Sequence, residues 1–498
     1  MNRKRSKWSY AIGCTGRDMC YTLVSMFLAI YIQYSGLMND TQFGVFVIIM
    51  VLCKVWDAIN DPMMGTIISN TKTRLGKYRP WVLIGCLSNA IFLILLFTLR
   101  FEGEGQGWLN VAALGVVYLL WGMTFTMNDV SYWSLLPALS EGKKDRDNLT
   151  SMVAVFASIG AFTAGGLVPM LTTGEVVLGY RIFGITFAVI FMLCQLLVFF
   201  FTHDNKYDKF MLTKEELAQE PKEKTINLKD MFKILVRNKQ LLVMAVVVLL
   251  YTTASGFLTV FGQNFFYFKF GYDGGLVTLF TVVYAIGTLV PQFLFPVITT
   301  KFTRKQIVSV SLLITIIGYI AFFIVANLNI DSMLCFALLC CFGVLVFGGQ
   351  GMFYMAMLIM LTNTIEYDEW KTGERNEAVT FSVRPFMVKL SGAIQTGIVS
   401  LTLLACGLYN LTQEIGKLEI KKGQELIGDA QLIQDANEIL NQATSNQEFF
   451  LSIAMTLVPI LMFIATYFII KKKYIIDEDL YEKMTKEIAL RKENQQAE

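Results

Sequence analysis

The sequence predicts an all-α membrane protein of twelve transmembrane helices with both termini in the cytoplasm. Of its 498 residues, 55% are hydrophobic and only 16% are charged, whereas a soluble globular chain has about 25% charged residues. Apolar stretches about 20 residues long, the length that crosses a bilayer, recur between short polar breaks. Lysine and arginine gather in every second break, which is typical of cytoplasmic loops. Together these observations favour a polytopic helical protein.

The composition also excludes other classes of protein. The formal net charge is only +3, and no clustered basic face is evident, so we expect no nucleic-acid partner. The nine cysteines lie in apolar stretches without metal-ligand spacing, and the single histidine, His203, lies in a charged segment. No nucleophile and base occur at catalytic spacing. We therefore expect no enzyme and no cofactor.

The predicted spans follow one another along the whole chain, each bounded by a polar break. Their ends are set only by where the apolar residues stop, because a long span can tilt or project beyond the bilayer. They cover residues 10–34, 43–69, 80–99, 108–137, 150–171 and 180–201, and then 241–270, 277–298, 307–325, 334–364, 378–408 and 449–470.

The loops between these spans predict the orientation. Basic residues precede the first span and follow the second, fourth, sixth and eighth. The intervening loops 35–42, 102–107 and 327–331 contain neither lysine nor arginine. Because basic loops stay on the cytoplasmic side, both termini are predicted to be cytoplasmic and the protein to lie in the cytoplasmic membrane of the cell.

One long charged segment, 203–240, divides the spans into two sets of six. The sequence therefore predicts an N-terminal half over 1–202, a cytoplasmic linker over 203–240, a C-terminal half over 241–472 and a cytoplasmic tail over 473–498. The outer loop before the last span is unusually long, and its apolar spacing predicts an amphipathic helix over 429–440.

Charged side chains inside the spans are the main functional signal, because an ionised group at the bilayer centre costs about 2.5 to 3.5 kcal/mol. Arg17 and Asp18 are adjacent in the first span. Asp57 and Asp61 are one helical turn apart in the second, so they share a face. Two such carboxylates repel each other in a low dielectric. A bound cation, a shared proton or a basic partner must relieve that repulsion.

The fourth span carries a polar and aromatic face at turn spacing, formed by Phe125, Thr126, Asp129 and Trp133. Sugar hydroxyls donate hydrogen bonds to a carboxylate, while the C–H face of the sugar lies on an aromatic ring. This face is therefore suited to a sugar.

Oxygen ligands for a hard monovalent cation are available from Asp57, Asp61, Asn60 and Thr126. Compensating positive charge could come from the eleventh predicted span, which carries two basic residues, Arg384 and Lys389. From the charges alone, the chain is predicted to be a cation-coupled transporter of a polar solute.

Other interpretations of these residues stay open. Asp57 and Asp61 could form purely structural ion pairs between helices, either instead of a functional role or alongside it. Trp133 could be an interfacial belt residue, although its place one turn after Asp129 favours stacking against a sugar.

Four motifs in order along the chain resemble the melibiose permease-like family of glycoside-pentoside-hexuronide:cation symporters, within the major facilitator superfamily. They are WDAINDP at 56–62, TRLGKYRPW at 73–81, WGMTFTMNDVSYWSLLP at 121–137 and EYDEWKTGERNE at 366–377. The resemblance implies the major facilitator fold of two six-helix halves, and alternating access around a central site.

The resemblance also implies roles for particular residues. It assigns sugar contacts to Asp18, Asp129 and Trp133, with Arg17 and Phe125 where the family has a lysine and a tyrosine. It assigns the cation site to Asp57, Asn60, Asp61 and Thr126, with Asp57 and Asp61 as the charged ligands of the monovalent ion. Lys389 matches a lysine that lies near the cation-site carboxylates and implies a role in coupling.

Three departures from the family concern the sugar site. A family arginine in the fifth span aligns with Ala154, a tryptophan in the tenth span aligns with Tyr354, and a threonine in the eleventh aligns with Pro385, beside Arg384. Since one arginine is lost and another gained elsewhere, we include Tyr354 and Arg384 among the sugar-binding residues and do not infer that the sugar is melibiose.

The expected function is therefore symport of a glycoside, pentoside or hexuronide with Na+, Li+ or H+, by a protein that works as a monomer in a lipid bilayer. Two alternatives remain. One is transport of an amphiphile such as a lysolipid on the same fold, which would need a wide apolar cleft. The other is a non-transporting sugar sensor, which would need an added signalling domain.

Overall fold

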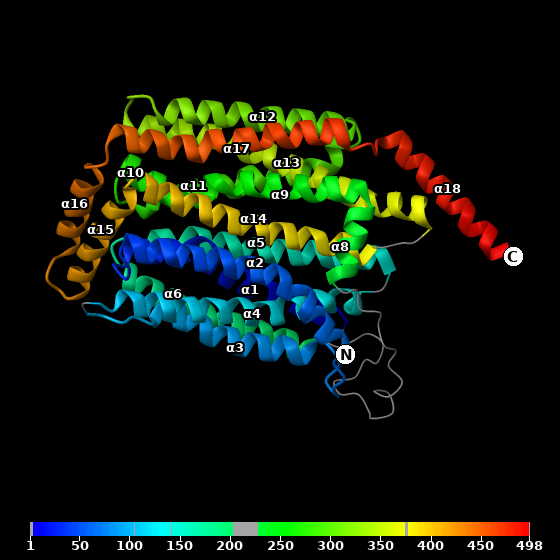
Figure 1. Ribbon diagram of the computed structural model, residues 1–498, viewed down its shortest axis with the longest axis horizontal. Coiled ribbons are helices and arrows are strands. Elements are labelled where there is room, and N and C mark those ends of the chain that lie inside the picture. The colour runs from blue at the N-terminus through cyan, green and yellow to red at the C-terminus, as the bar shows by residue number, and fades with distance from the viewer. Residues whose placement is uncertain (1–2, 104, 141, 203–227, 374–376, 498) are drawn as a thin grey trace. The chain divides into compact units, whose positions relative to one another are not determined.

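The computed structural model describes residues 3–103, 105–140, 142–202, 228–373 and 377–497 (Figure 1). His203, most of the predicted linker and residues 374–376 of the fourth motif lie outside these residues. Every regular element in the described part of the chain is a helix. The expectation of an all-helical chain is confirmed there.

The helices of the N-terminal part correspond closely to the first six predicted spans. They are α1 (Arg3–Tyr34), α2 (Asp40–Asn70), α3 (Arg79–Thr98), α4 (Gly107–Leu139), α5 (Gly142–Thr172) and α6 (Val176–Phe201).

The C-terminal part contains more helices than predicted spans, because further helices lie before, between and after those that correspond to the spans. They are α8 (Leu228–Arg237), α9 (Lys239–Val260), α10 (Gly262–Phe270), α11 (Gly274–Ile298), α12 (Arg304–Ala326), α13 (Ser332–Thr372), α14 (Glu377–Ala405), α15 (Leu408–Gly423), α16 (Asp429–Leu440), α17 (Ser445–Lys473) and α18 (Glu478–Ala497).

Eleven of the described helices, or continuous helix pairs, are long and apolar enough to cross a membrane. The remaining predicted span corresponds to α1, which is 32 residues long but carries Arg17, Asp18 and a basic first turn. Length alone would let α1 cross a bilayer, since 32 residues rise about 48 Å. The chain is thus a multi-pass helical membrane protein, and α1 as its twelfth span stays a prediction.

Local sequence explains where several helices begin. Asn39 and Gln42 form a capping box before α2, and Thr303 and Gln306 form another before α12. In each box the first side chain accepts a hydrogen bond from a backbone N–H of the first turn, while the glutamine side chain accepts one from the cap residue. These caps satisfy donors that would otherwise be unpaired at a helix end.

The helices form two compact units. Unit 1 comprises Met1–Asn227, Phe266–Thr278 and Leu403–Thr444, and unit 2 comprises Leu228–Phe265, Leu279–Thr402 and Ser445–Glu498. In unit 1, α1 packs against α5 and α6, α4 packs against α2 and α3, and α15 packs on α1 and α6. In unit 2, α12 packs against α13 and α17, and α9 packs against α17.

Glycines let the helix backbones of unit 1 approach closely. A Cβ atom added at Gly85 of α3 would lie 2.6 Å from the backbone nitrogen of Asn128 in α4. One added at Gly160 of α5 would lie 2.3 Å from the carbonyl oxygen of Thr15 in α1. Small residues at helix interfaces allow such packing where lipid provides no hydrophobic driving force.

A buried polar network also ties these helices together. The Asn128 side chain donates to the carbonyl of Val82 and to Gln195, and Gln195 donates to the carbonyl of Gly13. Hydrogen bonds of this kind fix the helix register, because an unpaired amide in a low dielectric would be costly. The network therefore holds α1, α3, α4 and α6 in the arrangement that positions the charged residues.

Candidate functional site

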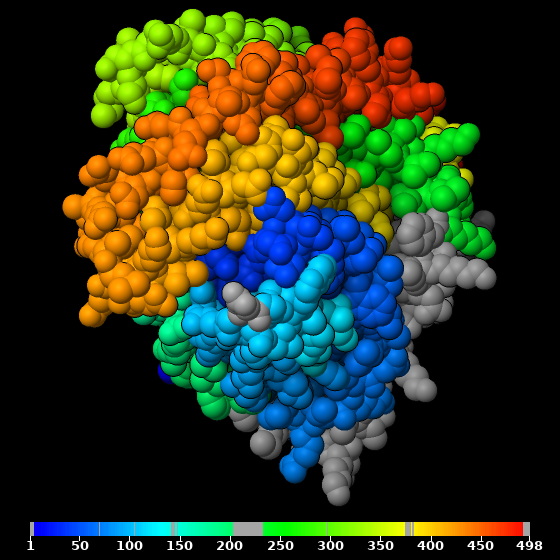
Figure 2. Space-filling model, turned by 60° about the vertical axis from the view of Figure 1, so that its left-hand side comes forward, coloured from blue at the N-terminus to red at the C-terminus, as the bar shows by residue number. Residues whose placement is uncertain are grey.

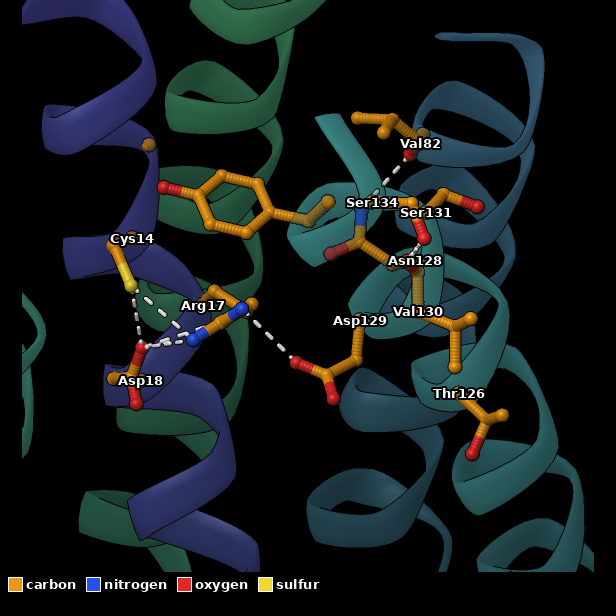
Figure 3. Close-up of polar contacts among 12 residues, drawn as sticks. Cys14, Arg17, Asp18, Val82, Thr126, Asn128, Asp129, Val130, Ser131 and Ser134 are labelled. Carbon is orange, nitrogen blue, oxygen red and sulfur yellow. Dashed lines mark hydrogen bonds and ion pairs between the residues drawn. The ribbon is translucent and has the colours of Figure 1, made fainter. Parts of the chain in front are cut away.

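The charged residues of α1 and α4 meet around one guanidinium group (Figure 3). Arg17 Nη2 lies 2.9 Å from Asp18 Oδ2, and Arg17 Nη1 lies 2.9 Å from Asp129 Oδ1. Only 4% of the Arg17 side chain is exposed, whereas the two carboxylate side chains are 25% and 24% exposed. We refer to Arg17, Asp18 and Asp129 as the charged triad.

The guanidinium of Arg17 is fixed by further contacts. It lies 4.9 Å from the centre of the Trp133 ring and 4.7 Å from that of Tyr132. Its Nη2 also donates to the sulfur of Cys14, whose thiol donates to Asp18 over 3.0 Å. Cation–π contacts and a bridged carboxylate pair leave the guanidinium little freedom. The triad is therefore a preorganised set of donors and acceptors with an exposed tryptophan beside it.

A second pair of carboxylates lies between α2 and α4. The hydroxyl of Thr126 donates to Asp61 Oδ1 over 3.0 Å. One turn earlier on each helix, Asp57 lies directly over Gly122, where an added Cβ atom would be 2.5 Å from Asp57 Oδ1. Asn60, which lies between the two aspartates in the sequence, is buried in the structure. These residues give four oxygen-bearing side chains within a little over one helical turn of α2 and α4.

Aromatic rings of α1 and α4 pack against one another in the same stretch of α4. The ring of Phe125 lies 5.4 Å from Trp121 and 5.2 Å from Tyr21, measured between ring centroids. Phe125 itself is buried, whereas Tyr21 is 37% exposed. Phe125 therefore supports neighbouring aromatic side chains and presents little surface of its own to a ligand.

Unit 2 brings together two of the predicted residues. The guanidinium of Arg384 donates to the hydroxyl of Tyr354 and lies 5.6 Å from the centre of its ring. Lys389 lies five residues further along α14, in the same unit. The predicted site residues thus form two clusters in unit 1, the charged triad and the second carboxylate pair, while Tyr354 and Arg384 form a third in unit 2.

Sequence reasoning missed three residues of the unit 1 group, namely Cys14, Tyr21 and Gly122. Cys14 lies one turn before Asp18 on the face that carries the triad, so helical spacing was a usable signal, but the cysteines were interpreted only as lacking metal-ligand spacing. Gly122 carried no such signal. Its role arises from the approach of α2 to α4, which the spacing along one helix cannot reveal.

Comparison with known proteins gives a consistent result. The family model described as MFS/sugar transport protein matches residues 9–478. The lactose permease of Leuconostoc lactis is 29% identical over 80% of this chain and 62% of the permease. The raffinose carrier protein of Pediococcus pentosaceus is 27% identical, with the same coverage. This chain therefore spans about three fifths of the length of these two relatives.

A shorter relative is covered more fully. The glucuronide carrier protein homologue of Escherichia coli K12 is 24% identical over 77% of this chain and 80% of that protein.

Solved structures agree on the fold. A bacterial homologue of the human lysosomal transporter Spinster, in an inward-facing and unoccupied conformation, superposes with a TM-score of 0.63 at 14% identity. The match covers 95% of this chain and 98% of that one. The nucleoside transporter NupG superposes with a TM-score of 0.54 at 15% identity, over 94% of this chain and 99% of NupG. At these identities the likeness shows the fold alone, and that fold is the major facilitator fold.

Proposed function

This chain belongs to the MFS/sugar transport protein family, and from that membership we propose that it is a secondary active symporter that carries a glycoside, pentoside or hexuronide together with a monovalent cation. The expected family and the expectation of a transporter and not an enzyme are confirmed by the family match. The identity of the sugar, the coupling ion and the residues that bind them are part of the proposal.

The arrangement of the charged triad carries the proposal for the sugar. Arg17 is buried and forms ion pairs with Asp18 and Asp129, while about a quarter of each carboxylate side chain stays exposed. Trp133 beside them is 40% exposed. Sugar hydroxyls can donate to the exposed carboxylates as a sugar face lies on the indole ring, and these are the few convergent polar groups that a small-molecule site needs.

The second carboxylate pair supports coupling to a cation. Asp57 and Asp61 lie one turn apart on α2, and Thr126 and the buried Asn60 add neutral oxygens. We propose that a monovalent cation, Na+, Li+ or H+, neutralises the pair and thereby raises the affinity of the triad for sugar. By linkage, bound sugar then raises the affinity for the cation by the same factor. The role of Lys389 in coupling is part of this hypothesis.

The architecture proposed for transport has twelve spans, with α1 as the first, both termini in the cytoplasm and two six-helix halves that rock around a central site. The basic residues that separate the predicted spans support this orientation. We propose that one copy of the chain is sufficient for transport, in the cytoplasmic membrane.

The test is uptake into proteoliposomes that contain the purified protein. Glycosides, pentosides and hexuronides would be screened with and without Na+, at two pH values. For a transported sugar, Asp57→Cys should abolish accumulation driven by the cation gradient. The matched control is Asp40→Asn, which replaces an acidic residue in the first turn of the same helix. This variant should accumulate sugar normally. Undiminished accumulation by Asp57→Cys would contradict the coupling role.

A further inference from the structure

The helices α15 and α16 form a small cap on unit 1, which we call the α15–α16 cap (Leu408–Leu440). Figure 2 shows these helices, in orange, at the molecular surface. The cap is attached at the ends of membrane helices. The Tyr409 hydroxyl donates to the carbonyl of Met38, and the Gln413 amide donates to that of Gln33. Gly416 lies against the end of α1, where an added Cβ atom would be 2.8 Å from the nitrogen of Gly36.

One carboxyl group of the cap is buried and joins three elements. Glu419 is 4% exposed. Its Oε2 accepts a hydrogen bond from the backbone N–H of Val176 over 3.0 Å, and its Oε1 accepts one from the hydroxyl of Tyr272 over 2.8 Å. Val176 is the first residue of α6, and the residue before it, Glu175, makes no side-chain cap. Glu419 thus caps α6 from a different part of the chain, where the helix dipole favours negative charge.

Tyr272 belongs to the connection between α10 and α11, which lies in unit 1 together with the cap. A second hydrogen bond joins the cap to this connection: the backbone N–H of Tyr272 donates to the Asn437 side chain of α16 over 2.8 Å. The helices on either side of the connection, α10 and α11, are hydrogen-bonded to α5 and to the residue that follows it. The hydroxyl of Thr278 donates to the carbonyl of Gly166 over 2.7 Å, and the hydroxyls of Thr173 and Tyr267 are 2.6 Å apart. The connection is therefore fastened to α5, α15 and α16.

The charged groups around Glu419 offset it only partly. Lys422, one turn further along α15, pairs with Glu175 at 2.8 Å and also with Asp429 of α16. Its positive charge is therefore shared between two other carboxylates. The connection contributes Tyr272, which is neutral. Burial raises the pKa of Glu419 to about 7, whereas the hydrogen bonds from Val176 and Tyr272 and the charge of Lys422 lower it, and Glu175 raises it.

We propose that Glu419 is a proton-binding site, separate from the sugar and cation sites, that fastens the α10–α11 connection to the cap more tightly when protonated than when charged. The inference rests on the proposed function in one respect: alternating access requires the outer ends of the membrane helices to separate, and in the predicted orientation the cap lies outside. Protons on that side then favour the fastened state.

The direction follows from linkage. A carboxyl released into water returns to its ordinary pKa of 4.5, whereas the buried one has a pKa of about 7. The fastened state therefore binds the proton more tightly. Its extra stability is fully present below pH 4.5 and is lost as the pH rises through 7. Between pH 5 and pH 7 the equilibrium constant for release should increase by roughly 40-fold at most, and it should level off above pH 7.

Hydrogen–deuterium exchange on the full-length protein, corrected for the intrinsic pH dependence of exchange, tests the proposal. In the wild-type protein, protection of the Val176 and Tyr272 amides should fall between pH 5 and pH 7. In Glu419→Gln, a substitution of nearly equal shape, protection should become independent of pH. Glu414→Gln, on the exposed face of α15, is the matched control and should behave like the wild-type protein.

A second variant provides an independent test in case Glu419→Gln does not fold. Tyr272→Phe removes one hydrogen bond that favours the charged carboxylate but keeps the titrating group. The loss of protection should therefore persist and move to higher pH. A pH dependence that survives in Glu419→Gln, or that is lacking in the wild-type protein, would overturn the proposal. Because exchange is measured without a transported solute, failure of sugar uptake would contradict the proposed function without affecting this result.

Discussion

At the scale of single residues, the approach of Asp57 to Gly122 makes a sharp prediction. In Gly122→Ala, the new Cβ atom would lie 2.5 Å from Asp57 Oδ1, so the carboxylate must move. If Asp57 binds the cation, we expect the cation concentration that half-maximally stimulates uptake to rise about tenfold, which corresponds to about 1.4 kcal/mol.

The control for this prediction is Gly65→Ala on α2, the helix that carries Asp57, where an added Cβ atom meets no atom within 4 Å. The measurement is sugar uptake as a function of cation concentration. If both variants respond to the cation like the wild-type protein, Asp57 does not act from the position that the structure gives it.

Arg17 makes a second prediction at this scale. Arg17→Gln removes the positive charge that Asp18 and Asp129 share, which leaves two carboxylates to repel each other and to lose their fixed positions. Hydrogen bonds to charged groups contribute about 1.5 to 3 kcal/mol, so sugar affinity should fall at least tenfold. Calorimetric titration with a transported sugar measures this. The control is Arg146→Gln, which replaces an exposed residue of α5. This variant should bind sugar like the wild-type protein.

The sequence was informative about which residue types form the site and less so about how they pair. Helical spacing alone placed Asp57 and Asp61 on one face, and the structure adds the hydrogen bond from Thr126 to Asp61. Helical spacing did not predict that Arg17 pairs with both Asp18 and Asp129, because the contact with Asp129 depends on the approach of α1 to α4. The prediction that Phe125 contacts sugar is untested, although its burial favours an indirect role.

At the scale of helices, the start of α18 offers a clean test. Asp477 precedes this helix, and its carboxylate accepts a hydrogen bond from the backbone N–H of Leu480 over 3.0 Å. That hydrogen bond, followed by the contact with Lys305, lowers the pKa of Asp477. The stabilisation is therefore present above the ordinary pKa of 3.8 and is lost as the pH falls below it.

Asp477→Ala should destabilise the first turn of α18 by about 1 kcal/mol, the usual effect of removing an N-cap. Amide exchange in residues 478–482 should accelerate accordingly. Asp477→Asn should preserve most of the protection, since asparagine caps a helix as well as aspartate does. Equal exchange rates in the alanine variant and the wild-type protein would show that the cap does not stabilise α18.

The elements that the sequence predicted best were those with strong periodicity. The amphipathic helix expected over 429–440 has the same bounds as α16. In contrast, α15 was not predicted, because it follows the preceding span after only a short break at Gly407, whose φ of 70° ends the helix without a polar segment. The break between α9 and α10 at Phe261 was likewise not predicted, because the short polar stretch of Gln263 and Asn264 lies inside a segment that is otherwise apolar and was predicted as one span.

At the scale of the whole molecule, the predicted orientation can be tested by labelling. In a Cys341→Ser background, a membrane-impermeant thiol reagent should label Gln431→Cys of the cap in intact cells. Lys301→Cys, between α11 and α12, and Lys4→Cys, at the start of α1, should react only after permeabilisation. Labelling of Lys4→Cys in intact cells would contradict α1 as the twelfth span.

Composition and loop charge were sufficient to predict a multi-pass helical protein, and the motifs were sufficient to predict its family. The division into compact units was not predictable in the same way. Three boundaries of the two units fall within α10, α11 and α14, and the others fall at the starts of α8 and α17. The two units are therefore not two continuous halves of the chain. Hydropathy measures only how favourably each segment is transferred into lipid. It does not depend on contacts between segments that are distant in the sequence.

The charged triad has one further consequence, which concerns selectivity. One guanidinium set against two carboxylates gives the triad a formal charge of −1. An anionic uronate would approach this excess negative charge and be repelled, whereas a neutral glycoside or pentoside would meet only acceptors for its hydroxyl protons. Among the three classes of solute proposed above, we therefore expect the charged triad to bind neutral glycosides and pentosides in preference to hexuronides.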